Sequence, residues 1–109
     1  LTPPIVKPDC THSYYTYAVK YDQNVIGVHR DEFQDRLLEK EVYFGKGYVK
    51  PLYLLPVYRK FGYTRGLCPV TERMWKDELM VFDWLRAPVT VRDIDKVIEI
   101  VEETIEECR

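Results

Sequence analysis

The chain has 109 residues and a formal net charge of −2, and 46% of its residues are hydrophobic. A chain of this length and composition folds as a single globular domain with a core of its own. No apolar run approaches the ~20 residues of a membrane-spanning helix, and the acidic balance speaks against nucleic acid as a partner.

Three widely spaced cysteines, Cys10, Cys68 and Cys108, fit neither a disulfide framework nor a closely paired metal-binding motif. We therefore expect reduced thiols in a cytoplasmic protein. We assign no metal site, because structural zinc sites use closely spaced ligand pairs.

Prolines at positions 3, 4 and 8 stiffen the start of the sequence. Because proline fixes its backbone near extended geometry, residues 1–11 are predicted to be a linker that arrives from another domain. The folded domain is assigned to residues 12–109. It begins with a predicted strand over residues 12–22, which are rich in aromatic and β-branched side chains. Alternation places on one face Tyr15, Tyr17, Val19 and Tyr21.

After a turn at residues 22–27, residues 28–41 are predicted to form a helix that is opened by His29 or Arg30. Its buried stripe consists of the apolar side chains Phe33, Leu37 and Leu38. The remaining face, which includes Arg30 and Gln34, is predicted to be solvated.

Residues 43–65 combine five tyrosines with five basic residues and contain no acid. Pro51 and Pro56 exclude a continuous helix, so we expect a long irregular segment, with a third strand within residues 48–55 as an open alternative. A loop of this length and composition is expected to meet an anionic, ring-bearing ligand or another protein face. Alternatively, its tyrosines pack on the domain's own core.

The last third of the chain is predicted to be a short helix over residues 67–77, a strand over residues 78–84 and a helix over residues 90–108. In the last helix, Thr90 suits the N-cap and Asp93 completes a capping box. Its apolar stripe consists of Val91, Ile94, Val97, Ile98, Val101 and Ile105. This order of elements predicts an α+β fold, a small mostly antiparallel sheet with helices packed on one face.

The sequence contains no glycine-rich phosphate loop and no nucleophile elbow, and Ser13 is its only serine. Of the two histidines, His12 is the better candidate for a site, because it stands beside Tyr14 where a neutral imidazole can hold or pass a proton. A purely structural bond between this histidine and the backbone is an equal alternative. The residue types alone therefore describe a module that forms one edge of a site whose catalytic groups lie elsewhere.

Five motifs follow one another in the order and spacing of one enzyme family. They are His12-Ser13-Tyr14-Tyr15-Thr16-Tyr17, Arg30-Asp31-Glu32-Phe33, Tyr48-Val49-Lys50-Pro51-Leu52, Cys68-Pro69-Val70-Thr71-Glu72 and Thr90-Val91-Arg92-Asp93-Ile94. Over nearly its whole length the chain resembles the C-terminal small domain of the DegT–StrS group of aminotransferases. These are fold-type I enzymes that depend on pyridoxal phosphate (PLP). Departures from the family pattern at residues 41–44 and 79–84 leave the amino-sugar and amino-cyclitol branches both open.

The resemblance implies that PLP, held by a lysine of an N-terminal large domain, carries an amino group from glutamate or glutamine to a keto-sugar or keto-cyclitol. No catalytic or cofactor-binding residue is assigned in residues 1–109, and the chain alone is expected to be inactive. By matching position, His12 and Tyr14 are the best candidates for substrate binding, and Tyr48 and Tyr53 are weaker ones. The implied partners are the large domain, a second copy in a homodimer, and a nucleotide-sugar whose diphosphate would suit the basic loop.

The alternative is a stand-alone binding or protein-interaction module that uses residues 43–65. If that loop held single-stranded nucleic acid by stacking and charge, its affinity would fall steeply with salt.

Overall fold

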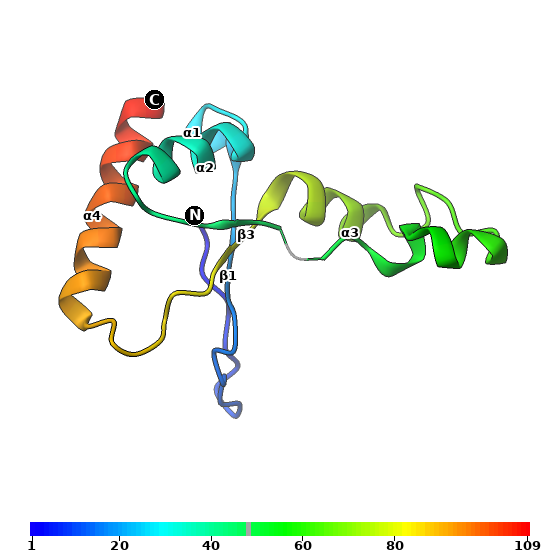
Figure 1. The fold of residues 1–109 in the computed structure, drawn as a ribbon, viewed down its shortest axis with the longest axis horizontal. Helices are drawn as coiled ribbons and strands as arrows, with labels where there is room; N and C mark the ends of the chain where they lie inside the picture. Colours follow the sequence, from blue (N-terminus) through cyan, green and yellow to red (C-terminus); the bar gives the residue numbers. More distant parts are fainter. Residues whose placement is uncertain (48) are drawn as a thin grey trace.

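The computed structural model describes residues 1–47 and 49–109 (Figure 1). A three-stranded antiparallel sheet in the order β1-β3-β2 joins distant parts of the chain. In chain order the elements are β1 (Tyr17–Lys20), α1 (Gln23–Ile26), α2 (Arg30–Glu39), β2 (Gly45–Lys46), the 3₁₀ helices η1 (Leu52–Leu54) and η2 (Pro56–Phe61), α3 (Pro69–Arg73), the π-helical turn η3 (Met74–Glu78), β3 (Leu79–Phe82) and α4 (Val91–Cys108). The predicted α+β fold with a small antiparallel sheet is confirmed.

The core lies between this sheet and the two longer helices. β3 is the central strand, and its Met80 pairs with Val19 of β1. Helix α2 contributes Phe33 and Leu37, which are fully buried, and α4 adds a row of partly buried side chains. Burying one large apolar side chain contributes about 1.5–3 kcal/mol, so each of these buried residues stabilises the fold measurably.

Helix α4 begins as its sequence predicts. The Thr90 backbone N–H donates to Asp93 at 2.9 Å, and the Thr90 hydroxyl accepts from the Asp93 backbone N–H at 3.3 Å, which completes the capping box. At the other end, Lys40 of the α2 C-cap forms a 2.8 Å ion pair with Glu107. The buried face differs from the predicted stripe. Val91 and Ile98 are exposed, whereas Ile100 packs against the core. Thr104 is fully buried, and its hydroxyl donates to the Ile100 carbonyl.

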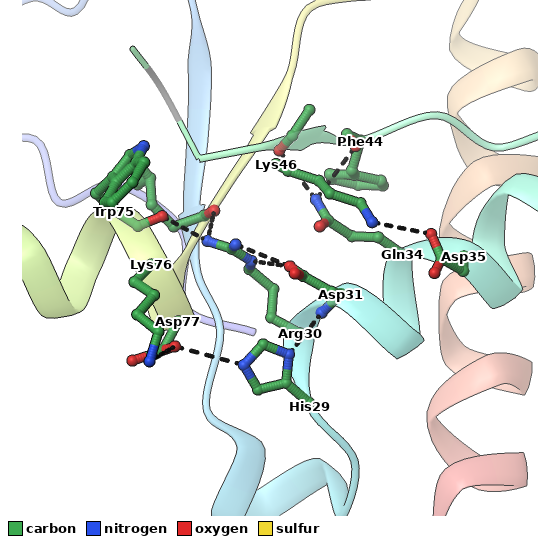
Figure 2. Close-up of polar contacts among 12 residues, drawn as sticks. His29, Arg30, Asp31, Gln34, Asp35, Phe44, Lys46, Trp75, Lys76 and Asp77 are labelled. Carbon is green, nitrogen blue, oxygen red and sulfur yellow. Dashed lines mark hydrogen bonds and ion pairs between the residues drawn. The ribbon is translucent and has the colours of Figure 1, made fainter. Parts of the chain in front are cut away.

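A buried arginine ties α2 to the segment that leads into β3 (Figure 2). The Arg30 side chain donates from Nη1 to the carbonyls of Trp75 (2.8 Å) and Leu79 (3.2 Å). Its Nε and Nη2 both donate to one oxygen of Asp31, at 3.0 and 2.8 Å. Burial would raise the pKa of Asp31, but the hydrogen bond and charge of Arg30 outweigh it and lower that pKa. The prediction that Arg30 is solvated is therefore wrong, since the residue is only 4% exposed.

Gln34 lies one turn further along α2 and is also buried, at 3% exposure, contrary to the prediction. Its amide nitrogen donates to the carbonyls of Phe44 and Gly45, at 3.2 and 2.9 Å, as Figure 2 shows. This contact holds the start of β2 against α2. The third strand is Gly45–Lys46. Residues 49–55, the described part of the segment left open for a third strand, contain the 3₁₀ helix η1 and no strand.

Three further predictions need correction. The first strand covers only Tyr17–Lys20 instead of residues 12–22, because the backbone turns before it and leaves Tyr15 86% exposed. The predicted turn at residues 22–27 contains the short helix α1, for which Asp22 is the N-cap. Leu38 is 55% exposed and does not belong to the buried stripe of α2.

Residues 50–68, which we call the arm, project away from the sheet (Figure 1). The arm contains η1 and η2, and its buried residues are Pro51 and Leu54. Its projection explains why the molecule measures 49 × 35 × 26 Å with a radius of gyration of 16.0 Å. A compact chain of this length has a radius of gyration of about 13 Å. The arm is thus a surface feature attached to a small core.

We predict that Arg30→Met lowers the free energy of unfolding by about 2–4 kcal/mol, because the carbonyls of Trp75 and Leu79 lose their charged donor. Urea denaturation measures the change. Arg36→Met on the same helix is the matched control, since it removes only an exposed ion pair with Glu32, and it should cost about 0.5 kcal/mol or less. Equal losses in the two variants would contradict a stabilising role for the buried network.

The capping box at α4 predicts a pH dependence. Hydrogen bonds from the Thr90 side chain and backbone lower the pKa of Asp93. A carboxylate of this kind stabilises the folded state above its unfolded pKa, and the contribution is lost as the pH falls through the folded pKa. The difference in Tm between the unchanged protein and Asp93→Ala should therefore be larger at pH 7 than at pH values below the folded pKa. Asp95→Ala removes a charge nearby without disturbing the cap, and an identical pH profile for both variants would contradict the prediction.

Candidate functional site

His12 and Tyr14, the two leading candidates from sequence, lie together in the turn that precedes β1. The Nδ1 atom of His12 accepts the backbone N–H of Tyr14 at 2.7 Å. The two rings stack with their centroids 4.3 Å apart. A neutral imidazole that accepts at Nδ1 carries its proton on Nε2, so His12 presents an N–H donor on its outer side.

Tyr14 adopts a left-handed backbone conformation, with φ at 51°. This region costs an ordinary L-residue roughly 1–2 kcal/mol, and such strain concentrates at functional sites and tight turns. The ring of Tyr14 stacks on His12, and the centroid of the Tyr17 ring lies 6.0 Å from that of Tyr14. The turn that shortens the predicted strand therefore also fixes the orientation of the two candidate side chains.

A cavity of about 330 Å³, which we call the β-end cavity, opens beside this turn. Because Tyr17 pairs with Phe82 in the sheet, residues just before β1 and just after β3 flank the same end. The cavity is lined by Tyr14, Tyr15, Phe82, Asp83, Leu85 and Arg86. One acid, one guanidinium and two phenol rings can orient a polar ligand of modest size.

Sequence reasoning missed Arg86, and it considered Asp83 only as a strand residue. Their one signal was their position at the end of a predicted strand, with Asp83 in its last two residues and Arg86 two residues beyond it. That position indicates a site only when the pairing partner of the strand is known, because the pairing determines which other residues lie at the same end of the sheet.

Tyr53 lies in a different region, on η1 of the arm. Its hydroxyl donates to Glu72 of α3 at 2.5 Å, and the same carboxylate oxygen accepts the Gly66 backbone N–H at 2.8 Å. Within the described residues no contact joins Tyr53 to His12 or Tyr14. Tyr48, the fourth candidate, lies outside the residues that the structure describes.

The hydrogen bond between Tyr53 and Glu72 links the arm to α3. Desolvation and the hydrogen bond to Glu72 raise the pKa of Tyr53 to about 12. The same hydrogen bond lowers the pKa of Glu72, with a further contribution from the Gly66 N–H. The pair keeps the phenol protonated and the carboxylate charged at neutral pH, so it serves as a fixed connection between the arm and α3.

A comparison with protein families decides the identity of the fold. Residues 1–102 match the DegT/DnrJ/EryC1/StrS aminotransferase family. The chain belongs to this family. No curated protein matches it. The match confirms, at the level of the family, the resemblance drawn from the five sequence motifs. Members of the DegT family generally use PLP.

PLP requires a lysine that is desolvated enough to act as a nucleophile. In this DegT-family chain every lysine is solvent-exposed except Lys40, which is half-buried and engaged by Glu107. Lys20 of β1 and Lys46 of β2 form ion pairs with Glu78 and Asp35, respectively. The described residues therefore do not fit the Schiff-base site of PLP, and we derive no step through the cofactor from them.

In residues 1–47 and 49–109, no group of three or more histidine, cysteine, aspartate or glutamate side chains is arranged to hold a metal ion. None of the described helices has the length and apolar character needed to cross a membrane.

We predict that Tyr14→Gly is more stable than Tyr14→Ala by about 1 kcal/mol, because glycine adopts the left-handed conformation without a steric penalty. Both variants lose the ring, so their difference isolates the backbone term. The same two substitutions at Tyr15, which has no positive φ, should show the opposite order, with alanine equal or better. Thermal or urea unfolding measures all four variants, and a more stable alanine at position 14 would contradict the assigned geometry.

Proposed function

We propose that this chain is the small domain of a PLP-dependent aminotransferase that moves an amino group from glutamate or glutamine to a keto-sugar or keto-cyclitol. In the overall reaction the donor becomes the corresponding 2-oxo compound, and the carbonyl oxygen of the acceptor is replaced by an amino group. The observation that carries the proposal is the family match over residues 1–102. The environments of the lysines support assigning the PLP-binding lysine to a separate large domain of the same polypeptide.

His12 and Tyr14 are the residues that we propose to contact the acceptor. The Nε2–H group of His12 can donate to a sugar or cyclitol hydroxyl, because Nδ1 is already engaged by the Tyr14 backbone. The stacked Tyr14 ring supplies an apolar surface for the carbon face of the same ligand. Asp83 and Arg86 in the β-end cavity would hold further hydroxyl or carboxylate groups. Tyr48 and Tyr53 stay as weaker candidates for substrate contact.

The large domain is proposed to cover the same end of the sheet. Apolar side chains gather there in solvent, including Trp84 at 55% exposure, with Tyr15, Leu85 and Val89. An exposed apolar surface rimmed by polar groups is typical of an interface. A substrate bound at the β-end cavity would then lie between the two domains. We further propose a homodimer as the full enzyme.

The test uses the full natural chain, purified with PLP. We expect addition of L-glutamate or L-glutamine without acceptor to release one 2-oxo product per active site, which chromatography quantifies. Addition of a keto-sugar or keto-cyclitol should then release the aminated product. L-Alanine is the control donor. If neither glutamate nor glutamine releases a 2-oxo product from PLP-loaded protein, the proposed reaction is wrong.

Two histidine variants connect the reaction to the site. His12→Asn should reduce kcat/KM for the keto acceptor by about tenfold or more while the donor half-reaction changes little, because a donor to the acceptor is lost. His29→Asn is the matched control, since His29 caps α2 and bonds Asp77 far from the turn. Equal effects of the two substitutions would contradict the role of His12.

A further inference from the structure

Tyr17 belongs to both the core and the end of the sheet where the candidate site lies. It is the first residue of β1, and its backbone pairs with Phe82 of the central strand β3. Its side chain is partly buried and packs against the hydrophobic core. Phe82 is itself buried and lines the β-end cavity, whereas the side chain of Tyr17 does not line it. Tyr17 therefore has a fixed position next to the site without forming part of its surface.

The ring of Tyr17 connects this fixed position to the two candidate side chains. Its centroid lies 6.0 Å from that of Tyr14, and the two ring planes differ by 27°. The Tyr14 ring also stacks on His12 at 4.3 Å, with ring planes that differ by 28°. Nearly parallel aromatic rings attract one another at such separations. Tyr17, Tyr14 and His12, which we call the ring series, therefore form a chain of contacts from the sheet to the imidazole.

The Tyr14 ring has few other contacts that could orient it. The residue is 48% exposed, and its backbone lies in the left-handed region. In residues 1–47 and 49–109 its hydroxyl forms no hydrogen bond, and its ring contacts no aromatic side chain other than those of the ring series. The backbone N–H of Tyr14 holds Nδ1 of His12 at 2.7 Å. The orientation of His12 thus depends on Tyr14, and that of Tyr14 on Tyr17.

We propose that Tyr17 is a positioning residue, whose ring sets the orientation of Tyr14 and, through it, of His12 for binding of the acceptor. The role in acceptor binding rests on the transamination proposed above, whereas the orientation itself does not. The ring and not the hydroxyl carries the effect, because the Tyr17 hydroxyl forms no hydrogen bond within the part of the chain that the structure describes. Phenylalanine should therefore substitute for Tyr17, and an aliphatic side chain should not.

A purely structural role of Tyr17 leads to different expectations. If the ring only filled space beside the core, Tyr17→Leu would change the stability of the protein and leave the candidate site as it is. Val19→Ala is the matched control, because Val19 lies two residues further along β1, is buried, and is not part of the ring series. This control should lower the Tm, since it removes buried apolar groups, and should leave His12 undisturbed.

¹⁵N NMR of the full natural chain, labelled at histidine, measures the orientation of His12 without reference to activity. The His12 signals are those that disappear in His12→Asn. At a pH where the imidazole is neutral, the bond from Tyr14 to Nδ1 should keep the proton on Nε2, so the two ring nitrogens give well-separated signals. In Tyr17→Leu the two signals should move toward each other, because both tautomers become populated. Tyr17→Phe and Val19→Ala should leave the signals as they are in the unchanged protein.

The kinetics of the two half-reactions measure the consequence for the acceptor. In Tyr17→Leu we expect KM for the keto acceptor to rise about tenfold, because a displaced imidazole and ring bind the acceptor less well. The donor half-reaction should change by less than about twofold, since the ring series is assigned to the acceptor. Tyr17→Phe should keep KM for the acceptor within about twofold of that of the unchanged protein, which a requirement for the hydroxyl would not allow.

Three outcomes would overturn the proposal. Unchanged His12 signals in Tyr17→Leu would show that the ring does not orient the imidazole. Changed signals with an unchanged KM for the acceptor would show that acceptor binding does not use this orientation. An equal rise of KM in Val19→Ala would show that a general loss of stability is the cause. Failure of the transamination itself is seen separately, as the absence of a 2-oxo product from the unchanged protein, and the NMR comparison still decides whether Tyr17 orients His12.

Discussion

The buried guanidinium of Arg30 is the interaction on which the arrangement of this domain depends. It connects the first turn of α2 with the carbonyls of Trp75 and Leu79, where the chain passes from η3 into the central strand. A guanidinium stays charged at all relevant pH values, so its burial is tolerated only because Asp31 and the carbonyls accept four hydrogen bonds from it. Gly47 belongs to the same constraint, since a Cβ there would approach the Trp75 carbonyl to 2.8 Å. Side chain, backbone and glycine together fix how β2, α2 and β3 meet.

The sequence predicted those elements whose information is local. Helix α4 has its cap, its capping box and its apolar period within one continuous stretch, and the structure agrees with the prediction to within a residue at its start. β3 and the α+β class were also predicted correctly, because a run of alternating apolar residues indicates a strand even when the strands that pair with it are unknown. The sequence left His29 or Arg30 as the residue that opens α2, and His29 is its N-cap.

The sequence did not predict features that depend on distant partners. The helical period predicts that a polar residue outside the apolar stripe is solvated. Arg30 and Gln34 are nevertheless buried, because they donate hydrogen bonds to backbone carbonyls that lie further along the chain. The left-handed backbone of Tyr14 has no signature in a row of tyrosines, so the first strand was predicted too long. The candidate site was therefore half predicted. His12 and Tyr14 were named, whereas Arg86 required knowledge of the strand pairing.

The order of strands in the sheet has a consequence for synthesis on the ribosome. The central strand β3 is the last of the three in the chain, and its partners β1 and β2 do not pair with each other. Until β3 has left the exit tunnel, β1 and β2 have no neighbour in this sheet, and α2 has only part of the surface that it covers. The arm is made before β3 and lies in the loop that β3 must close. Closing a long loop costs entropy before any contact repays it, so the sheet forms late and cooperatively, once most of the chain is present.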